Sequence, residues 1–113
     1  MKIPPDAIIP DEKLTRYLLV LREHDDKSKF LAQAGFTLVN PEVLQEAIQR
    51  LAATYEAVRE GENEYGEFYR VDGDMESAEG RNLSVVTIWL RWKSDGRFHF
   101  ITLKPLRGGR RET

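Results

Sequence analysis

The stretch from Tyr65 to Pro105 decides the fold: it reads YGEFYRVDGDM (65–75), LSVVTIWLRW (83–92) and RFHFITLKP (97–105). Two short polar loops that contain glycine, SAEGRN and KSDG, separate these three strand-like runs. Such loops are typical of antiparallel hairpins, because a crossover to a parallel strand needs a much longer connection. The sequence therefore predicts a meander of at least three antiparallel strands.

The N-terminal half of the chain carries helical signals instead. Apolar residues at helical spacing predict helices over about 11–20, 27–34 and 41–59. Gly35 is placed to end the second helix, and Asn40 followed by Pro41 is placed to begin the third. We therefore predict an α+β fold, with the N-terminal helices packed on one face of the C-terminal antiparallel β-meander. A single domain over about 1–107 and a polar tail over about 108–113 are expected.

The two faces of the predicted sheet differ in chemistry. One face of the second and third runs is wholly aliphatic, and it is expected to carry the helices. Its members are Val86, Ile88, Leu90, Ile101 and Leu103. The opposite face mixes aromatic side chains with Thr87, Arg91, Thr102 and Lys104. Such a face can cradle a polar ligand, or it can be a half-exposed face with favourable cross-strand pairs.

Composition excludes several classes of protein. The chain has 113 residues, 41% of them apolar and 32% charged, with a formal net charge of −2, which gives no global basic field. It has no cysteine and only two histidines, so we expect no disulfide, no metal site and no cofactor. No apolar run is long enough to span a membrane, and the start MKIPPDAIIP lacks the apolar stretch of a signal peptide. A cytoplasmic protein is the expectation.

A few side chains are candidates for chemistry. His24 lies in a charged loop before the second predicted helix and can titrate near neutrality, and Lys27 sits where a cation does not favour a helix N-terminus. Arg81 lies in the predicted hairpin turn, where a guanidinium can bind a phosphate through two hydrogen bonds. The alternative for all three is a charged side chain in water. His99 fits a position at the rim of the sheet.

Five segments, IPDEKLTRYLL, HDDKSKFLAQAGF, EYGEFYRVDGDM, EGRNLSVVTIWL and FITLKP, together resemble an uncharacterised bacterial domain family of about this length. That family is also found as the C-terminal part of larger secreted proteins. The segments span nearly the whole chain in the order of the family pattern. The positions that match this pattern are His24, Lys27, Gly35, Phe36, Tyr69, Gly80, Arg81, Thr87, Trp89, Thr102 and Pro105.

The family in turn resembles the barnase–colicin–RelE superfamily of metal-independent ribonuclease toxins. This resemblance implies an RNA substrate, activation of the ribose 2′-hydroxyl, and a small antitoxin protein as partner. The implied catalytic residues are His24, Lys27, Arg81, Thr87 and Thr102. The implied substrate-binding residues are Tyr69, Trp89 and Lys104. We expect the catalytic set to meet in one cleft on the sheet face opposite the long helix. The alternative is a non-catalytic protein-interaction module.

Overall fold

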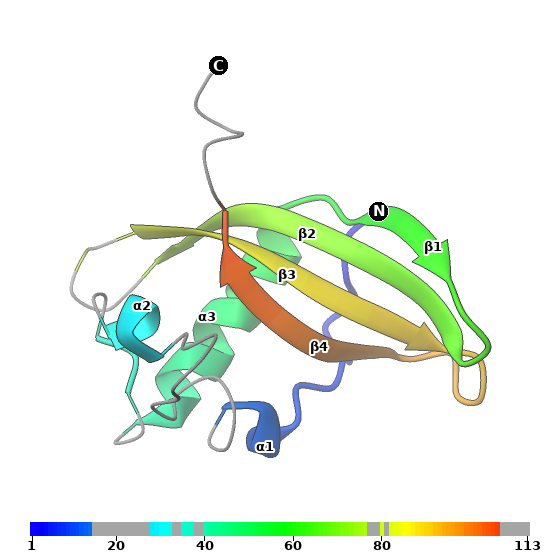
Figure 1. Ribbon diagram of the computed structural model, residues 1–113, viewed down its shortest axis with the longest axis horizontal. Coiled ribbons are helices and arrows are strands. Elements are labelled where there is room, and N and C mark those ends of the chain that lie inside the picture. Colours follow the sequence, from blue (N-terminus) through cyan, green and yellow to red (C-terminus); the bar gives the residue numbers. More distant parts are fainter. Residues whose placement is uncertain (15–27, 33–34, 38–39, 77–79, 81, 107–113) are drawn as a thin grey trace.

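The computed structural model describes residues 1–14, 28–32, 35–37, 40–76, 80 and 82–106 (Figure 1). Its helices and strands are α1 (Asp11–Lys13), α2 (Ser28–Ala32), α3 (Pro41–Thr54), β1 (Val58–Glu62), β2 (Gly66–Glu76), β3 (Asn82–Trp92) and β4 (Phe98–Pro105). The α+β class is confirmed. None of the described helices is long and apolar enough to cross a membrane.

The four strands form one sheet in the order β1-β2-β3-β4, and every neighbouring pair is antiparallel. The predicted meander is confirmed, with one strand more than its minimum of three. The N-terminal segment runs beside β4, where the amide of Ile8 donates to the carbonyl of Phe98 and the amide of Phe100 donates to the carbonyl of Ile8, each at 2.8 Å. The segment therefore adds a short parallel bridge to the β4 edge.

The extra strand corrects the predicted end of the long helix. α3 begins at Pro41 as expected but ends at Thr54, and Tyr55 is already extended with φ −106° and ψ 153°. The ring of Tyr55 lies against Gly73 of β2, so closely that a Cβ atom at Gly73 would come within 2.4 Å of it. Val58 fits the helical spacing of apolar residues that predicts a helix over 41–59. In the structure it instead starts β1 and is 59% exposed. The helical spacing beyond Thr54 is thus coincidental.

The hydrophobic core joins α3 to the sheet. α3 contacts β2 and lies beneath the sheet in Figure 1. From the helices, the core takes Leu31, Leu44, Ala47, Ile48, Leu51 and Ala52. From the strands, it takes Tyr69, Val71, Met75, Leu83, Val85, Trp89, Phe98, Phe100 and Leu103.

The prediction of which sheet face meets the core is wrong for β3. The core contains Val85 and Trp89, so Val86, Ile88 and Leu90 point to the other face. Thr87 is fully buried on the core side because its hydroxyl has partners: it donates to the carbonyl of Val71 at 3.1 Å and accepts from Trp89 Nε1 at 2.9 Å. A satisfied hydroxyl can be buried at little cost.

A β-bulge changes the phase of β4. Ile88 pairs with Thr102 and Trp89 pairs with Phe100, so Ile101 is the extra residue between them. Ile101 therefore does not join the core, contrary to the prediction. Leu103, two positions on, pairs with Thr87 and is buried in the core as predicted.

Candidate functional site

Three of the predicted site residues lie in the core. Thr87 is fully buried and Trp89 nearly so, and together they form the hydrogen-bonded pair described above. The ring of Trp89 also packs edge-on against Phe100. Tyr69 is buried against the ring of Phe98, with the ring centroids 5.1 Å apart. The prediction that Thr87 and Trp89 line an open sheet face is therefore wrong.

The two predicted threonines do not share a site. Thr87 pairs with Leu103 on the core side, whereas Thr102 pairs with Ile88 on the other face, and Lys104 lies opposite Val86. The alternation of the strands thus points the two hydroxyls in opposite directions. His24, Lys27 and Arg81 lie outside the described residues, so their catalytic roles stay predictions.

Arg70, which shares the sheet face of Thr102 through the pairing of both residues with Ile88, already has a partner. Arg70 donates to both carboxylate oxygens of Asp72, from Nε at 2.6 Å and from Nη2 at 2.9 Å. This hydrogen-bonded pairing raises the pKa of Arg70 above its ordinary value. The guanidinium of Arg70 is thus neutralised by its own strand neighbour rather than held for a ligand.

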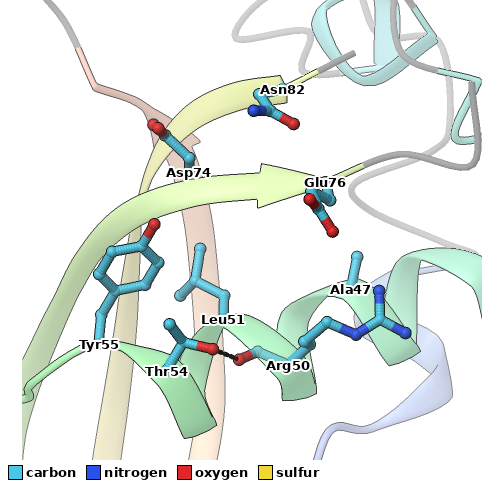
Figure 2. A pocket seen from close by; sticks show the side chains of 8 residues that line it. All are labelled: Ala47, Arg50, Leu51, Thr54, Tyr55, Asp74, Glu76 and Asn82. Atoms are coloured by element: carbon cyan, nitrogen blue, oxygen red, sulfur yellow. Dashed lines mark hydrogen bonds between the residues drawn. The ribbon is translucent and has the colours of Figure 1, made fainter. Parts of the chain in front are cut away.

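A pocket of about 290 Å³ lies between α3 and the C-terminal end of β2. Figure 2 shows Ala47 and Leu51 rising from the helix, Glu76 pointing back toward it, and Thr54 donating to the carbonyl of Arg50 at 2.7 Å. The other lining residues are Tyr55, Asp74 and Asn82. With two carboxylates and one guanidinium, the lining does not favour an anion. Among the residues that the structure describes, no group of three or more His, Cys, Asp or Glu side chains is placed to hold a metal ion.

The opposite end of β2 carries a different constellation, centred on Glu67. Its Oε2 lies 3.7 Å from Arg59 Nε and its Oε1 lies 3.8 Å from Arg91 Nη1. Arg59 also donates from Nη2 to Oε1 of Glu62 at 2.6 Å, so its charge is shared between two carboxylates. The phenol of Tyr69 donates to Oε1 at 3.5 Å. The side chain of Glu67 is 33% exposed, so the carboxylate is held among its partners and still reaches solvent. We call Arg59, Glu67, Tyr69 and Arg91 the Glu67 cluster.

The sheet register brings this cluster together. Arg59 of β1 pairs with Tyr69 of β2, and Glu67 of β2 pairs with Arg91 of β3. Gly66 allows this approach, because a Cβ atom there would lie 2.0 Å from the carbonyl oxygen of Arg91. The cluster is thus assembled from three strands at one end of the sheet.

A pocket of about 210 Å³ opens beside the cluster and is lined by Glu67, Arg91, Trp92, Lys93 and Gly96. A carboxylate that faces two cations next to a cavity can accept a proton from a bound hydroxyl, while the cations stabilise an anionic group. Among the described residues, this is the arrangement best suited to chemistry on a phosphate ester.

Sequence analysis did not find the Glu67 cluster. The run EGENEYGE, which ends at Glu67, is strongly acidic and fits a solvated loop. The signal that was available is the hairpin itself, since antiparallel pairing of the first two runs sets a carboxylate opposite an arginine.

Comparison with known proteins gives one family match and one similar solved structure. The family model described as Domain of unknown function (DUF6883) matches residues 4–107. Among solved structures, the chain is similar to a chain of a contact-dependent growth inhibition toxin–immunity protein complex from Klebsiella pneumoniae 342. The TM-score is 0.65 at 19% identity, and the match covers 91% of this chain and 96% of that chain. At this identity the likeness shows a shared fold. No curated protein matches the sequence.

Proposed function

The chain belongs to the family described as Domain of unknown function (DUF6883), and from the geometry of the Glu67 cluster we propose that it is a toxin-like domain that cleaves RNA without a metal ion. The observation that carries this proposal is the Glu67 carboxylate, held between Arg59 and Arg91 at the mouth of a pocket. Glu67 is the proposed general base.

The cluster and the pocket beside it supply the groups for the proposed reaction. Glu67 takes the proton from a ribose 2′-hydroxyl, and the 2′-oxygen forms a bond to the adjacent phosphorus. The bond from phosphorus to the 5′-oxygen breaks, and this oxygen takes a proton from water. The products are a 2′,3′-cyclic phosphate and a 5′-hydroxyl. Arg91 and Lys93, which line the pocket, stabilise the negative charge that develops on the phosphate oxygens. Tyr69, through its hydrogen bond, positions the carboxylate.

Two further observations support a toxin-like role. The fold resembles that of a chain from a toxin–immunity protein complex, and the match extends over nearly the full length of both chains. The domain family that the sequence resembles is in turn similar, in architecture and residue types, to the barnase–colicin–RelE superfamily of ribonuclease toxins. We propose that a small neutralising protein binds this chain, as an antitoxin or immunity protein binds a toxin.

The sequence-based proposal for His24, Lys27 and Arg81 stands beside the Glu67 cluster. All three are cations or can become cations, so they are suited to protonating the leaving oxygen or to binding phosphate. Alanine substitution of each residue, assayed for RNA cleavage, tests these roles separately from that of Glu67.

Induced expression in bacteria tests the proposed function. We expect the native chain to arrest growth and to degrade cellular RNA, and we expect Glu67→Gln to relieve both effects. Glu64→Gln is the matched control, because Glu64 is an exposed glutamate three residues away in the same segment. It should remain as toxic as the native chain.

Harmless expression of the native chain, with intact RNA, contradicts the proposal. That outcome favours the second candidate function, a non-catalytic protein-interaction module. The observation behind this alternative is that the similar solved chain belongs to a complex of two proteins. Equal toxicity of the native and Glu67→Gln chains would instead remove Glu67 from the mechanism.

A further inference from the structure

An exposed group of aromatic side chains stands next to the Glu67 pocket. Tyr65 is 57% exposed and Trp92 is 37% exposed, an unusual placement for large aromatic rings. Their ring centroids are 6.5 Å apart, and the ring of His99 lies 5.1 Å from that of Trp92. We call Tyr65, Trp92 and His99 the aromatic platform.

The backbone holds the platform in place. The amide of Lys93 donates to the carbonyl of Tyr65 at 2.9 Å, which ties the loop before β2 to the turn after β3. Asn63 Oδ1 accepts from the amides of Tyr65 and Gly66 at 2.8 and 3.0 Å. Both loops lie at the right-hand end of the sheet in Figure 1. These hydrogen bonds thus join the two loops that present the rings.

The two tryptophans differ in a way that bears on function. Trp89 is buried and its indole N–H donates to Thr87, so its role is structural. The indole N–H of Trp92 has no hydrogen-bond partner among the residues that the structure describes, and its ring is partly in solvent. Trp92 is therefore partly exposed and has an indole N–H that can donate to a ligand.

Trp92 also lines the Glu67 pocket, together with Arg91 and Lys93. Arg91 and Trp92 are successive residues of β3 and point to opposite faces of the sheet, so the pocket that both line lies at the strand end, between the cations and the ring. A planar apolar surface beside a pocket with two cations matches the chemistry of an unstacked nucleotide, in which a planar base is joined to an anionic phosphate. Bases inside a duplex have no free faces, so only a single strand can use such a surface.

We infer that the aromatic platform binds an unpaired base of single-stranded RNA while the adjacent phosphate lies in the Glu67 pocket. This inference rests on the proposed function, because it names the substrate class of the same site. It predicts that the chain discriminates by strandedness, cutting loops and single strands and sparing duplexes.

Binding is measured with the full chain carrying Glu67→Gln, so that RNA is not consumed. Fluorescence anisotropy of a labelled short single-stranded RNA of mixed sequence, at one fixed salt concentration, gives the dissociation constant. We expect Tyr65→Leu and Trp92→Leu each to raise that constant by about tenfold, the usual scale for losing one stacked base. Val58→Ala, at an exposed apolar residue of β1, should leave the constant unchanged.

The intrinsic fluorescence gives an independent readout of the same contact. Trp89 is buried, so a change of emission on adding RNA should come from Trp92 and should vanish in Trp92→Leu. The duplex of the same sequence should bind more weakly and leave the emission unchanged. Circular dichroism establishes that each variant is folded.

Three results overturn the inference. They are dissociation constants that neither leucine variant changes, a duplex that binds as tightly as the single strand, and a neutralising protein that occupies Trp92 while RNA does not bind. The inference and the proposed function can fail independently. If the native chain cleaves RNA but the Trp92→Leu variant binds RNA with unchanged affinity, only the role of the aromatic platform is wrong. If single-stranded RNA binds through Trp92 but is never cleaved, only the catalytic proposal is wrong.

Discussion

At the scale of single residues, Thr87 shows how a hydroxyl is accommodated in the hydrophobic core. It donates to Val71 and accepts from Trp89, both inside the core. Thr87→Val keeps the shape and removes the oxygen, so the indole N–H of Trp89 and the carbonyl of Val71 each lose this buried partner. We expect a loss of about 1–3 kcal/mol in the free energy of unfolding, measured by urea denaturation.

Thr87→Ser is the control for this change, because it keeps the hydroxyl and loses only a methyl group. The indole N–H of Trp89 should exchange with solvent faster in Thr87→Val than in Thr87→Ser. Equal exchange rates, together with native stability of Thr87→Val, would show that the buried hydroxyl has no structural role.

Asp95 gives a prediction about pH. Its Oδ1 accepts from the amide of Arg97 at 2.8 Å and its Oδ2 lies 3.2 Å from His99 Nε2. The amide hydrogen bond first, and His99 second, lower the pKa of Asp95 below its ordinary value of 3.8. The stabilisation is therefore present above that ordinary value and is lost as the pH falls through the lower folded pKa.

An NMR titration of the carboxyl carbon of Asp95 measures this pKa directly. The amide of Arg97 should titrate with the same midpoint, and Asp95→Asn should abolish that dependence. A midpoint at or above 3.8 would contradict the hydrogen-bonded turn.

Residue chemistry also set the limit on predicting the site. The strand alternation that sequence analysis used for β3 is correct, but the aliphatic set was assigned to the core and the set with Thr87 and Trp89 to solvent. The polarity of its residue type alone cannot show that Thr87 donates a hydrogen bond to the carbonyl of Val71 on the neighbouring strand. Glu67 was missed for the converse reason, since an acidic run hides a carboxylate that meets arginines only through cross-strand register.

At the scale of elements, the β2–β3 ladder depends on two glycines in different ways. A Cβ atom at Gly66 would lie 2.0 Å from the backbone carbonyl oxygen of Arg91, whereas at Gly73 its three nearest atoms all belong to the ring of Tyr55, the closest at 2.4 Å. The Tyr55 side chain can shift to relieve the contact, whereas a backbone that is paired in the sheet cannot. We expect Gly66→Ala to cost about 1–3 kcal/mol of stability, and Gly73→Ala to cost less.

Thermal or urea unfolding of the two variants checks this order. Gly66→Ala should also weaken the Glu67 cluster, because it moves β2 away from Arg91. A less stable Gly73→Ala than Gly66→Ala would mean that the ring of Tyr55 is held more firmly than the strand pair.

Elements set by local sequence signals could be predicted, whereas elements whose boundaries depend on tertiary contacts could not. The hairpins between Tyr65 and Pro105 follow from turn residues and alternation, both local signals, and the structure confirms them. The end of α3 and the presence of β1 depend on the contact of Tyr55 with Gly73 and on pairing with β2. The bulge at Ile101 is also a pairing effect, so it could not be seen in the spacing of one strand.

At the scale of the whole molecule, the proposed chemistry gathers at one end of the sheet. The Glu67 cluster and the aromatic platform come from the loops and strand ends that meet there. The net charge of −2 offers no general attraction for RNA, so binding must come from this local set of cations and rings. The sequence predicts a resemblance to ribonuclease toxins but assigns the catalytic roles to other residues, His24, Lys27, Arg81, Thr87 and Thr102.

The most direct test is cleavage of a purified single-stranded RNA in the presence of a metal chelator, followed by analysis of the product ends. We predict that the native chain and Glu64→Gln yield 2′,3′-cyclic phosphate and 5′-hydroxyl ends, and that Glu67→Gln is slower by about a hundredfold or more. RNA with 2′-O-methyl riboses should resist cleavage, because it lacks the attacking hydroxyl. Intact RNA with the native chain, or full activity of Glu67→Gln, would contradict the account.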